Sequence, residues 1–125
     1  MTIETIGIDA DDTLWQNEQF FRFTEAQFAG LLADYADKDH LSEKLLAAER
    51  KNLALYGFGI KGFMLSMIET AITVTDGKVP AQVIEQILAL GKDMLSHPIE
   101  PLPRVRETLE QLHPLYRLVM ITKGD

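Results

Sequence analysis

The sequence contains no cysteine, no long apolar run and no excess of positive charge. Without cysteine the chain has neither disulfide bonds nor thiolate metal ligands, and we expect a reducing, cytoplasmic location. No apolar stretch approaches the ~18 residues of a membrane-spanning helix, and the first residues lack the features of a secretory signal. Nineteen acidic against twelve basic side chains give a net charge of −7. Neither a membrane nor a nucleic acid is therefore expected as a partner.

What the chain does have is enough apolar side chains for a folded core. Its 125 residues are 46% hydrophobic and 25% charged, which is the balance of a globular domain. Strand-like stretches stand near the two ends and helical patterns fill the middle, with no internal repeat. The pattern predicts a mixed α/β protein.

A strand is expected at each end of this pattern. Residues 2–9 form a β-branched stretch that stops at a cluster of acids. The apolar run at residues 116–122 has the composition of a strand buried on both faces. Parallel strands joined by a crossover have their carboxyl ends at one edge of the sheet, so Asp9 and Thr122 should be neighbours. Open α/β sheets bind their ligands at that edge.

Five helices are expected between the strands, because apolar residues recur there at intervals of three and four. Asp39 is expected to cap the second helix, Gly57 to end it, and Pro80 to open the fourth. The expected apolar faces are Phe21, Phe28, Leu32 and Tyr35; Leu41, Leu45, Leu46, Leu53 and Tyr56; Ile60, Met64, Met67, Ile68 and Ala71; Val83, Ile87, Leu90 and Met94; and Val105, Leu109 and Leu112.

The acid cluster after the first strand is the most informative segment, and it reads DADDTL over residues 9–14. Two carboxylates two residues apart in extended backbone point the same way. One can attack phosphorus while the other protonates the leaving group and later takes a proton from water. Such a pair also attracts magnesium. On spacing alone, ordinary loop and capping acids remain the alternative.

This segment, preceded by its hydrophobic strand, resembles the first motif of the haloacid dehalogenase-like (HAD) superfamily. In that family the first Asp is the nucleophile, which forms an aspartyl-phosphate, and the Asp two residues on is the general acid/base. The resemblance implies these catalytic roles for Asp9 and Asp11. It also implies that magnesium is held by the Asp9 side chain and the Asp11 main-chain carbonyl.

The sequence LVMITKG at residues 118–124 looks like the second motif of the family, a hydrophobic strand that ends in Ser or Thr. The resemblance implies that the Thr122 hydroxyl helps to bind the transferred phosphoryl group. The helical insertion is similar to the family's cap of the first type, a lid that excludes water and selects the substrate. The implied fold is a partial HAD-like α/β core with two parallel strands, at residues 1–15 and 101–125, and an inserted four-helix cap at 16–100. A small bundle for packing or dimerisation is the alternative for these helices.

Asp11 also favours a phosphate ester as substrate, since family dehalogenases usually lack an acid at that position. The implied activity is a magnesium-dependent phosphatase for a small phosphorylated metabolite. Two further family motifs normally lie beyond the length of this chain, so we expect it to cover the N-terminal half of a family member and to be inactive alone. The alternatives are a 2-haloacid dehalogenase and a non-catalytic helical interaction module, with a homodimer or swapped assembly formed through exposed strand edges.

The segment GFGIKG at residues 57–62 matches the dinucleotide-binding pattern G-x-G-x-x-G, but a helical pattern precedes it where a strand is required. We expect a turn between two helices instead. Lys61 in that turn is a candidate substrate-binding residue, with a solvated lysine as the alternative. His40, His97 and His113 each adjoin a helix boundary, where capping or solvent exposure is expected rather than metal binding.

Overall fold

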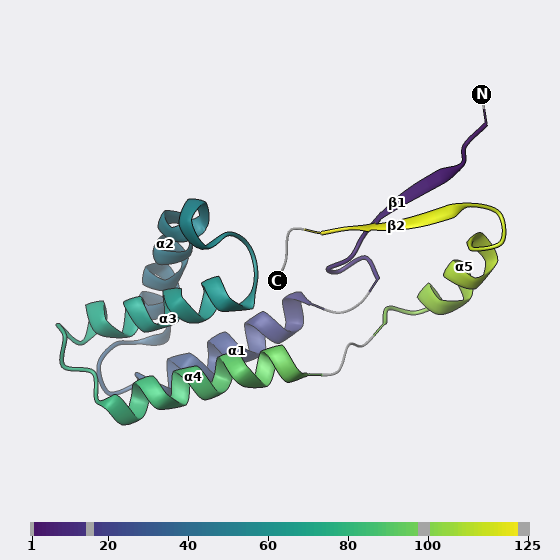
Figure 1. Ribbon diagram of the computed structural model, residues 1–125. Helices are drawn as coiled ribbons and strands as arrows, with labels where there is room; N and C mark the ends of the chain where they lie inside the picture. Colours follow the sequence, from purple (N-terminus) through teal and green to yellow (C-terminus); the bar gives the residue numbers. More distant parts are fainter. Residues whose placement is uncertain (1, 15–16, 98–100, 123–125) are drawn as a thin grey trace. The chain divides into compact units, whose positions relative to one another are not determined.

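The structure is a computed structural model that describes residues 2–14, 17–97 and 101–122. Two compact units are present, a strand unit (described residues 2–14, 17–20 and 101–122) and a helical unit (residues 21–97). The predicted domain boundaries, after residues 15 and 100, fall outside the described residues. The elements are β1 (Thr5–Asp9), α1 (Glu18–Leu31), α2 (Lys38–Tyr56), α3 (Ile60–Val74), α4 (Ala81–Ser96), α5 (Val105–Leu112) and β2 (Arg117–Ile121) (Figure 1).

The strand unit contains the predicted parallel pair. β1 and β2 pair in a register that runs from Thr5 opposite Arg117 to Asp9 opposite Ile121. Residues of β1 alternate between exposed and half-buried, as expected for a strand with one covered face. Two parallel strands joined through inserted helices confirm the predicted α/β architecture with a helical insertion.

Burial of β2 on both faces was a wrong prediction. The exposed fractions of Val119, Met120 and Ile121 are 39%, 55% and 61%. The apolar composition of a strand indicates how much burial it needs, whereas the burial it receives depends on neighbouring elements. Among the described residues the sheet has only two strands, so much of the apolar surface of β2 stays exposed.

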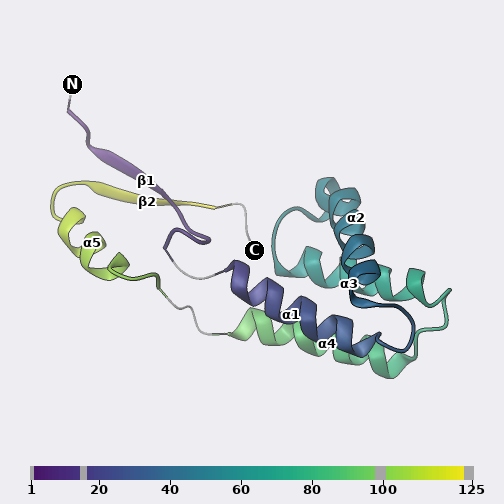
Figure 2. The same ribbon diagram turned by 180° about the vertical axis from the view of Figure 1, so that it is seen from behind.

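The helical unit has a continuous apolar core. α3 packs against both α2 and α4 (Figure 2), and the rings of Phe21 and Phe63 lie 4.9 Å apart. At Gly91 of α4 an added Cβ would lie 2.2 Å from the sulfur of Met64 in α3, so the two helices approach closely where Gly91 has no side chain. The buried core residues are Phe28, Leu32, Leu41, Leu45, Phe63, Met67, Ala71 and Ile87.

Two details of the predicted helices were wrong near the junction of α1 and α2. α1 ends at Leu31 and turn residues follow, so Tyr35 leaves the buried face and is exposed. The α2 cap is Asp37, not Asp39, since the Asp37 side chain accepts a hydrogen bond from the backbone N–H of His40. Asp39 lies in the first helical turn, where a negative charge is also favourable.

The apolar face predicted for α2 was too wide. Leu41 and Leu45 are buried, but Leu46, Leu53 and Tyr56 are exposed. Asn52 occupies the buried face instead, where its amide donates hydrogen bonds to Ser66 and Glu69 of α3. A polar residue with partners on the neighbouring helix is compatible with burial, which an apolar pattern cannot reveal.

The glycine-rich segment forms the predicted turn, between α2 and α3. Gly57 and Gly59 have φ angles of 72° and 130°, a backbone region that residues other than glycine rarely adopt. A Cβ at Gly62 would lie 3.1 Å from the Cβ of Tyr56. The three glycines therefore allow a tight turn between helices. No helix within the described residues is long and apolar enough to span a membrane.

Candidate functional site

A tight turn directly after β1 holds the acid cluster. The carbonyl of Ala10, a fully buried residue, accepts hydrogen bonds from the backbone N–H groups of Thr13 (3.1 Å) and Leu14 (2.8 Å). The chain therefore reverses just beyond the strand. Asp9 and Asp12 are exposed and Asp11 is half-buried, so the turn presents carboxylates at the carboxyl end of β1.

The side chain of Asp9 is held by a residue of the same turn. Thr13 Oγ1 donates a hydrogen bond of 2.9 Å to Oδ2 of Asp9. A hydroxyl that donates to one carboxylate oxygen restricts the rotation of the carboxylate. An oriented carboxylate is the arrangement in which Asp9 could act as a nucleophile.

Asp12 has a structural partner that distinguishes it from the other two acids. Its backbone has a positive φ of 59°, which Asp adopts more readily than most residues. Its Oδ1 accepts hydrogen bonds from the backbone N–H groups of Asn17 (3.0 Å) and Glu18 (3.1 Å), at the start of α1. Asp12 thus caps α1 and ties the acid turn to the first helix.

Thr122 lies at the same edge of the sheet as the acid turn. Asp9 is opposite Ile121 in the parallel register, and Thr122 is the next residue, exposed like Asp9. The two residues predicted to be neighbours therefore stand at the carboxyl ends of paired strands. Lys123 and Gly124, which complete the second motif in the sequence, lie outside the described residues.

Lys61 belongs to the other unit. It is exposed in the first turn of α3, in the helical unit. Its role in substrate binding stays a prediction.

The sequence analysis did not identify the structural roles of Asp12 and Thr13. Capping residues usually lie two or three positions before the N–H groups that they accept from. Asp12 lies five and six positions before its donors, so the usual capping pattern does not reveal it. The contact from Thr13 to Asp9 depends on the turn, which only the folded chain shows.

The donor chemistry of the turn fits part of a magnesium site. Magnesium prefers hard oxygen ligands in octahedral geometry and usually retains several waters, and Asp9 and Asp11 supply two carboxylates and backbone carbonyls. Within the described part of the chain, no group of three or more His, Cys, Asp or Glu residues is placed to hold a metal. The described chain therefore offers two candidate ligand residues rather than a complete set.

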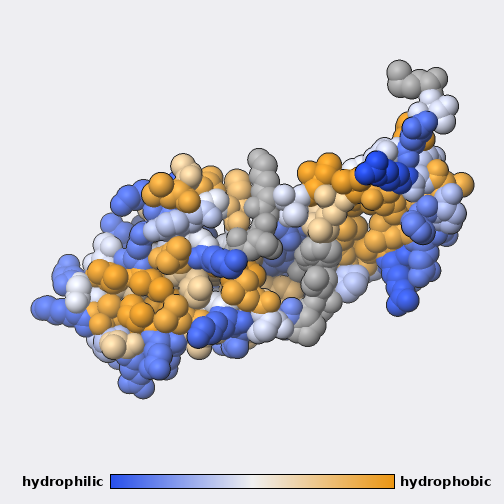
Figure 3. All heavy atoms as spheres, viewed as in Figure 1, coloured by the Kyte–Doolittle hydropathy of each residue, from blue (hydrophilic) through white to orange (hydrophobic). Residues whose placement is uncertain are grey.

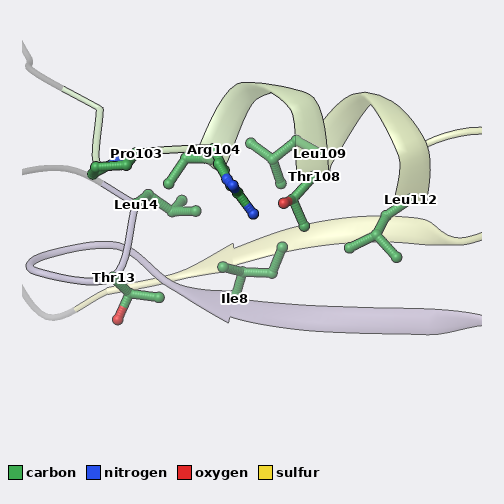
Figure 4. A pocket seen from close by; sticks show the side chains of 9 residues that line it. Ile8, Thr13, Leu14, Pro103, Arg104, Thr108, Leu109 and Leu112 are labelled. Atoms are coloured by element: carbon green, nitrogen blue, oxygen red, sulfur yellow. The ribbon is translucent and has the colours of Figure 1, made fainter.

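A hollow of about 220 Å³ lies between α5, β1 and the acid turn, all in the strand unit. Its walls are mainly apolar, and Figure 4 shows Ile8, Leu109 and Leu112 directed toward it, together with Arg104. The Thr13 hydroxyl points away from the hollow in the same view, in keeping with its bond to Asp9. The Thr13 hydroxyl and the apolar hollow are thus on different sides of the loop.

A parallel strand pair with acids at its carboxyl edge and helices inserted between its strands defines an α/β fold with a helical cap. No family model matches the chain, and no curated protein sequence matches it. The solved structure of a haloacid dehalogenase-like family hydrolase from Xanthomonas campestris is 44% identical with a TM-score of 0.90, over 98% of this chain and 52% of that one. The chain belongs to the haloacid dehalogenase-like family, as its first motif predicted.

A second solved structure is similar in fold. It is described as a predicted phosphoglycolate phosphatase from Haemophilus somnus 129pt, and the match has 18% identity and a TM-score of 0.52. This match also covers 98% of the chain and 52% of the other protein. The chain therefore spans about half the length of both neighbours.

Proposed function

We propose that the chain carries the nucleophile-bearing half of a hydrolase that acts on small phosphate monoesters. The observation that carries the proposal is the position of Asp9. Asp9 ends β1 beside the carboxyl end of β2, and Thr13 donates a hydrogen bond to its carboxylate. The similar structure from Xanthomonas campestris is described as a hydrolase of the same family, which supports this activity.

In the proposed reaction, an oxygen of the Asp9 carboxylate attacks the phosphorus of the ester, and the bond from phosphorus to the leaving alcohol oxygen breaks. Protonated Asp11 gives its proton to that oxygen. Water then attacks the phosphorus of the aspartyl-phosphate while ionised Asp11 takes a proton from it. Inorganic phosphate leaves, Asp9 is again a carboxylate, and Asp11 is again an acid.

Further groups have binding roles in the proposal. The Thr122 hydroxyl donates a hydrogen bond to the transferred phosphoryl group, and Lys61 meets the anionic substrate from the helical unit. Magnesium, held by the Asp9 side chain and the Asp11 carbonyl, would reduce the negative charge of the phosphate that repels the nucleophile. A cytoplasmic location stays a prediction from the sequence.

The chain alone is proposed to be inactive, so the test uses a chimera. In the Xanthomonas campestris hydrolase, the matched half is replaced by residues 1–122 of this chain, and the parent protein is assayed alongside. With magnesium and p-nitrophenyl phosphate, we expect turnover that falls by at least about 10³-fold in Asp9→Asn and Asp11→Asn. Asp39→Asn, at an exposed position in α2, is the matched control and should leave turnover unchanged.

Two results would contradict the proposal. Halide release from 2-chloropropionate without phosphate release would identify a dehalogenase, in which Asp9 attacks carbon. Turnover by the 125-residue chain alone, lost in Asp9→Asn, would show that the remaining half of the family fold is not required.

A non-catalytic interaction module is the second candidate. The observation in its favour is the exposed apolar surface of β2, at Val119, Met120 and Ile121, since an uncovered strand can pair with another chain. A chimera that folds without hydrolysing either substrate, although its parent does, would favour this candidate.

A further inference from the structure

Apolar side chains gather on the outer surface of the helical unit, over α3 and α4 (Figure 3). Leu65 and Ile72 of α3 and Leu95 of α4 are each more than 40% exposed, and Leu88 of α4 is half-buried. Leu65 and Ile72 are two helical turns apart, as are Leu88 and Leu95, so each pair lies on one face of its helix. We call these four residues the outer α3–α4 surface.

Loose packing does not explain this exposure. The seam between α3 and α4 is so close that a Cβ on Gly91 would overlap the side chain of Met64. Ile87 of α4 and Met67 of α3 are fully buried beneath the seam. The core below the seam is already filled, so the outer leucines and isoleucine are not needed to complete it. Grouped apolar residues on a protein surface commonly mark an interaction site.

Two charged residues of α4 border the outer α3–α4 surface, and they have opposite signs. Glu85 and Lys92 are both exposed on α4, two turns apart on the face that also carries Leu88 and Leu95. A separation of seven residues is about 10.5 Å along the helix, too far for the two side chains to pair with each other. Neither forms an ion pair within the described residues.

This order of charges is self-complementary. When a second copy of α4 lies antiparallel across the first, Glu85 of each copy faces Lys92 of the other, and a two-fold axis passes near Ala89. The small side chain of Ala89 allows the helices to approach. An isologous contact of this kind requires one patch that matches itself. A different partner would need its own acidic and basic groups at the same spacing.

We propose that two copies of the chain associate through the outer α3–α4 surface, with α4 antiparallel to α4 of the second copy and two reciprocal Glu85–Lys92 pairs. The leucines and isoleucine are buried between the copies, and the charges set the direction of the helices. This inference does not depend on the proposed phosphatase activity, because it concerns the helical unit alone and its test measures mass.

Sedimentation equilibrium tests the proposal in the micromolar range. We expect the wild-type chain, with a monomer mass of 14.1 kDa, to form a dimer that weakens as salt is added. Glu85→Lys and Lys92→Glu should each raise the dimer dissociation constant about tenfold, because like charges then meet at two places. A mixture of the two variants should restore the association. One variant carries lysine at both positions and the other carries glutamate at both, so opposite charges meet again in the mixed dimer.

The double variant Glu85→Lys/Lys92→Glu should also dimerise like the wild type. Far-UV circular dichroism serves as the folding control, because both positions are exposed. A wild-type chain that remains monomeric would overturn the proposal, and so would single variants that associate normally or a mixture without restored association. A dimer whose dissociation constant is unchanged by the substitutions at Glu85 and Lys92, but which is lost in Met120→Lys, would locate the contact on β2 instead.

Discussion

Thr13 Oγ1 donates a 2.9 Å hydrogen bond back across the turn to Oδ2 of Asp9, four residues earlier. The same turn is closed by two backbone bonds to the Ala10 carbonyl. The orientation of the Asp9 carboxylate is therefore built into the local fold of the loop. It does not require a contact from the helical unit.

The first prediction concerns this bond. Thr13→Val keeps the shape of the side chain but removes the hydroxyl, so the turnover of the chimera should fall roughly tenfold, in line with one hydrogen bond to a charged group. Thr13→Ser keeps the donor and should retain most of the activity. The measurement is kcat with p-nitrophenyl phosphate. A Thr13→Val turnover within a factor of two of wild type would show that the bond does not position Asp9.

The second prediction concerns the cap of α1. Asp12→Ala removes the acceptor for the Asn17 and Glu18 N–H groups and places alanine at a positive φ, so the free energy of unfolding should fall by about 1–2 kcal/mol. Asp12→Asn keeps an acceptor oxygen and tolerates this backbone, and should lose much less. Urea unfolding followed by circular dichroism compares them. Equal losses for both variants would contradict the capping role.

Gly30 and Gly91 provide a matched pair for the third prediction, because both lie in helices but only Gly91 is in a close seam. Nothing lies within 4 Å of a Cβ added at Gly30, so Gly30→Ala should stabilise the chain by about 0.5–1 kcal/mol. At Gly91 the added Cβ meets the side chain of Met64. Gly91→Ala should therefore be destabilising.

Substitution of the opposing methionine is the control for Gly91. If the clash is local, Gly91→Ala should cost less in a Met64→Ala background than in the wild type, and the coupling free energy from the double-mutant cycle measures the difference. Thermal unfolding supplies the values. Additive effects of the two substitutions would show that α3 and α4 are not in close contact at this point.

The fourth prediction concerns pH. The Tyr56 hydroxyl donates a 3.1 Å hydrogen bond to Oε1 of Glu69, and this bond, with smaller contributions from burial and the Glu69 charge, raises the pKa of Tyr56. The folded state then holds the phenol proton more tightly than the unfolded state. The resulting stabilisation is present below the unfolded pKa of about 10 and is lost as the pH rises through the folded pKa.

Absorbance near 295 nm follows the ionisation of tyrosine directly. Glu69→Ala removes both the acceptor and the charge, so the titration of Tyr56 should move to lower pH, and Tyr56→Phe identifies its share of the signal. The stability difference between wild type and Tyr56→Phe should shrink in the same alkaline range. A Tyr56 titration unchanged by Glu69→Ala would contradict the assigned cause.

The element order could be read from the sequence because each element carries a local signal. Alternation of apolar residues indicates β1, and the three- and four-residue spacing of Met64, Met67 and Ala71 fits α3. The spacing of apolar residues did not predict burial where a polar side chain has a hydrogen-bond partner in another element. Asn52 is buried against Ser66 and Glu69 of α3, whereas Leu53 beside it is exposed.

For the candidate site, the sequence by itself determined the residue types and their place at strand ends. DADDTL at residues 9–14 identified the family, since a motif depends on residue identity and short spacing. Only the tertiary structure showed that Asp12 caps α1, because its positive φ directs its carboxylate to the start of that helix. The crossover rule for parallel strands already predicted that Asp9 and Thr122, more than a hundred residues apart in sequence, lie at one edge of the sheet. Only the tertiary structure gave the register, in which Asp9 is opposite Ile121. The register between distant strands depends on the path of the whole chain, which no local pattern encodes.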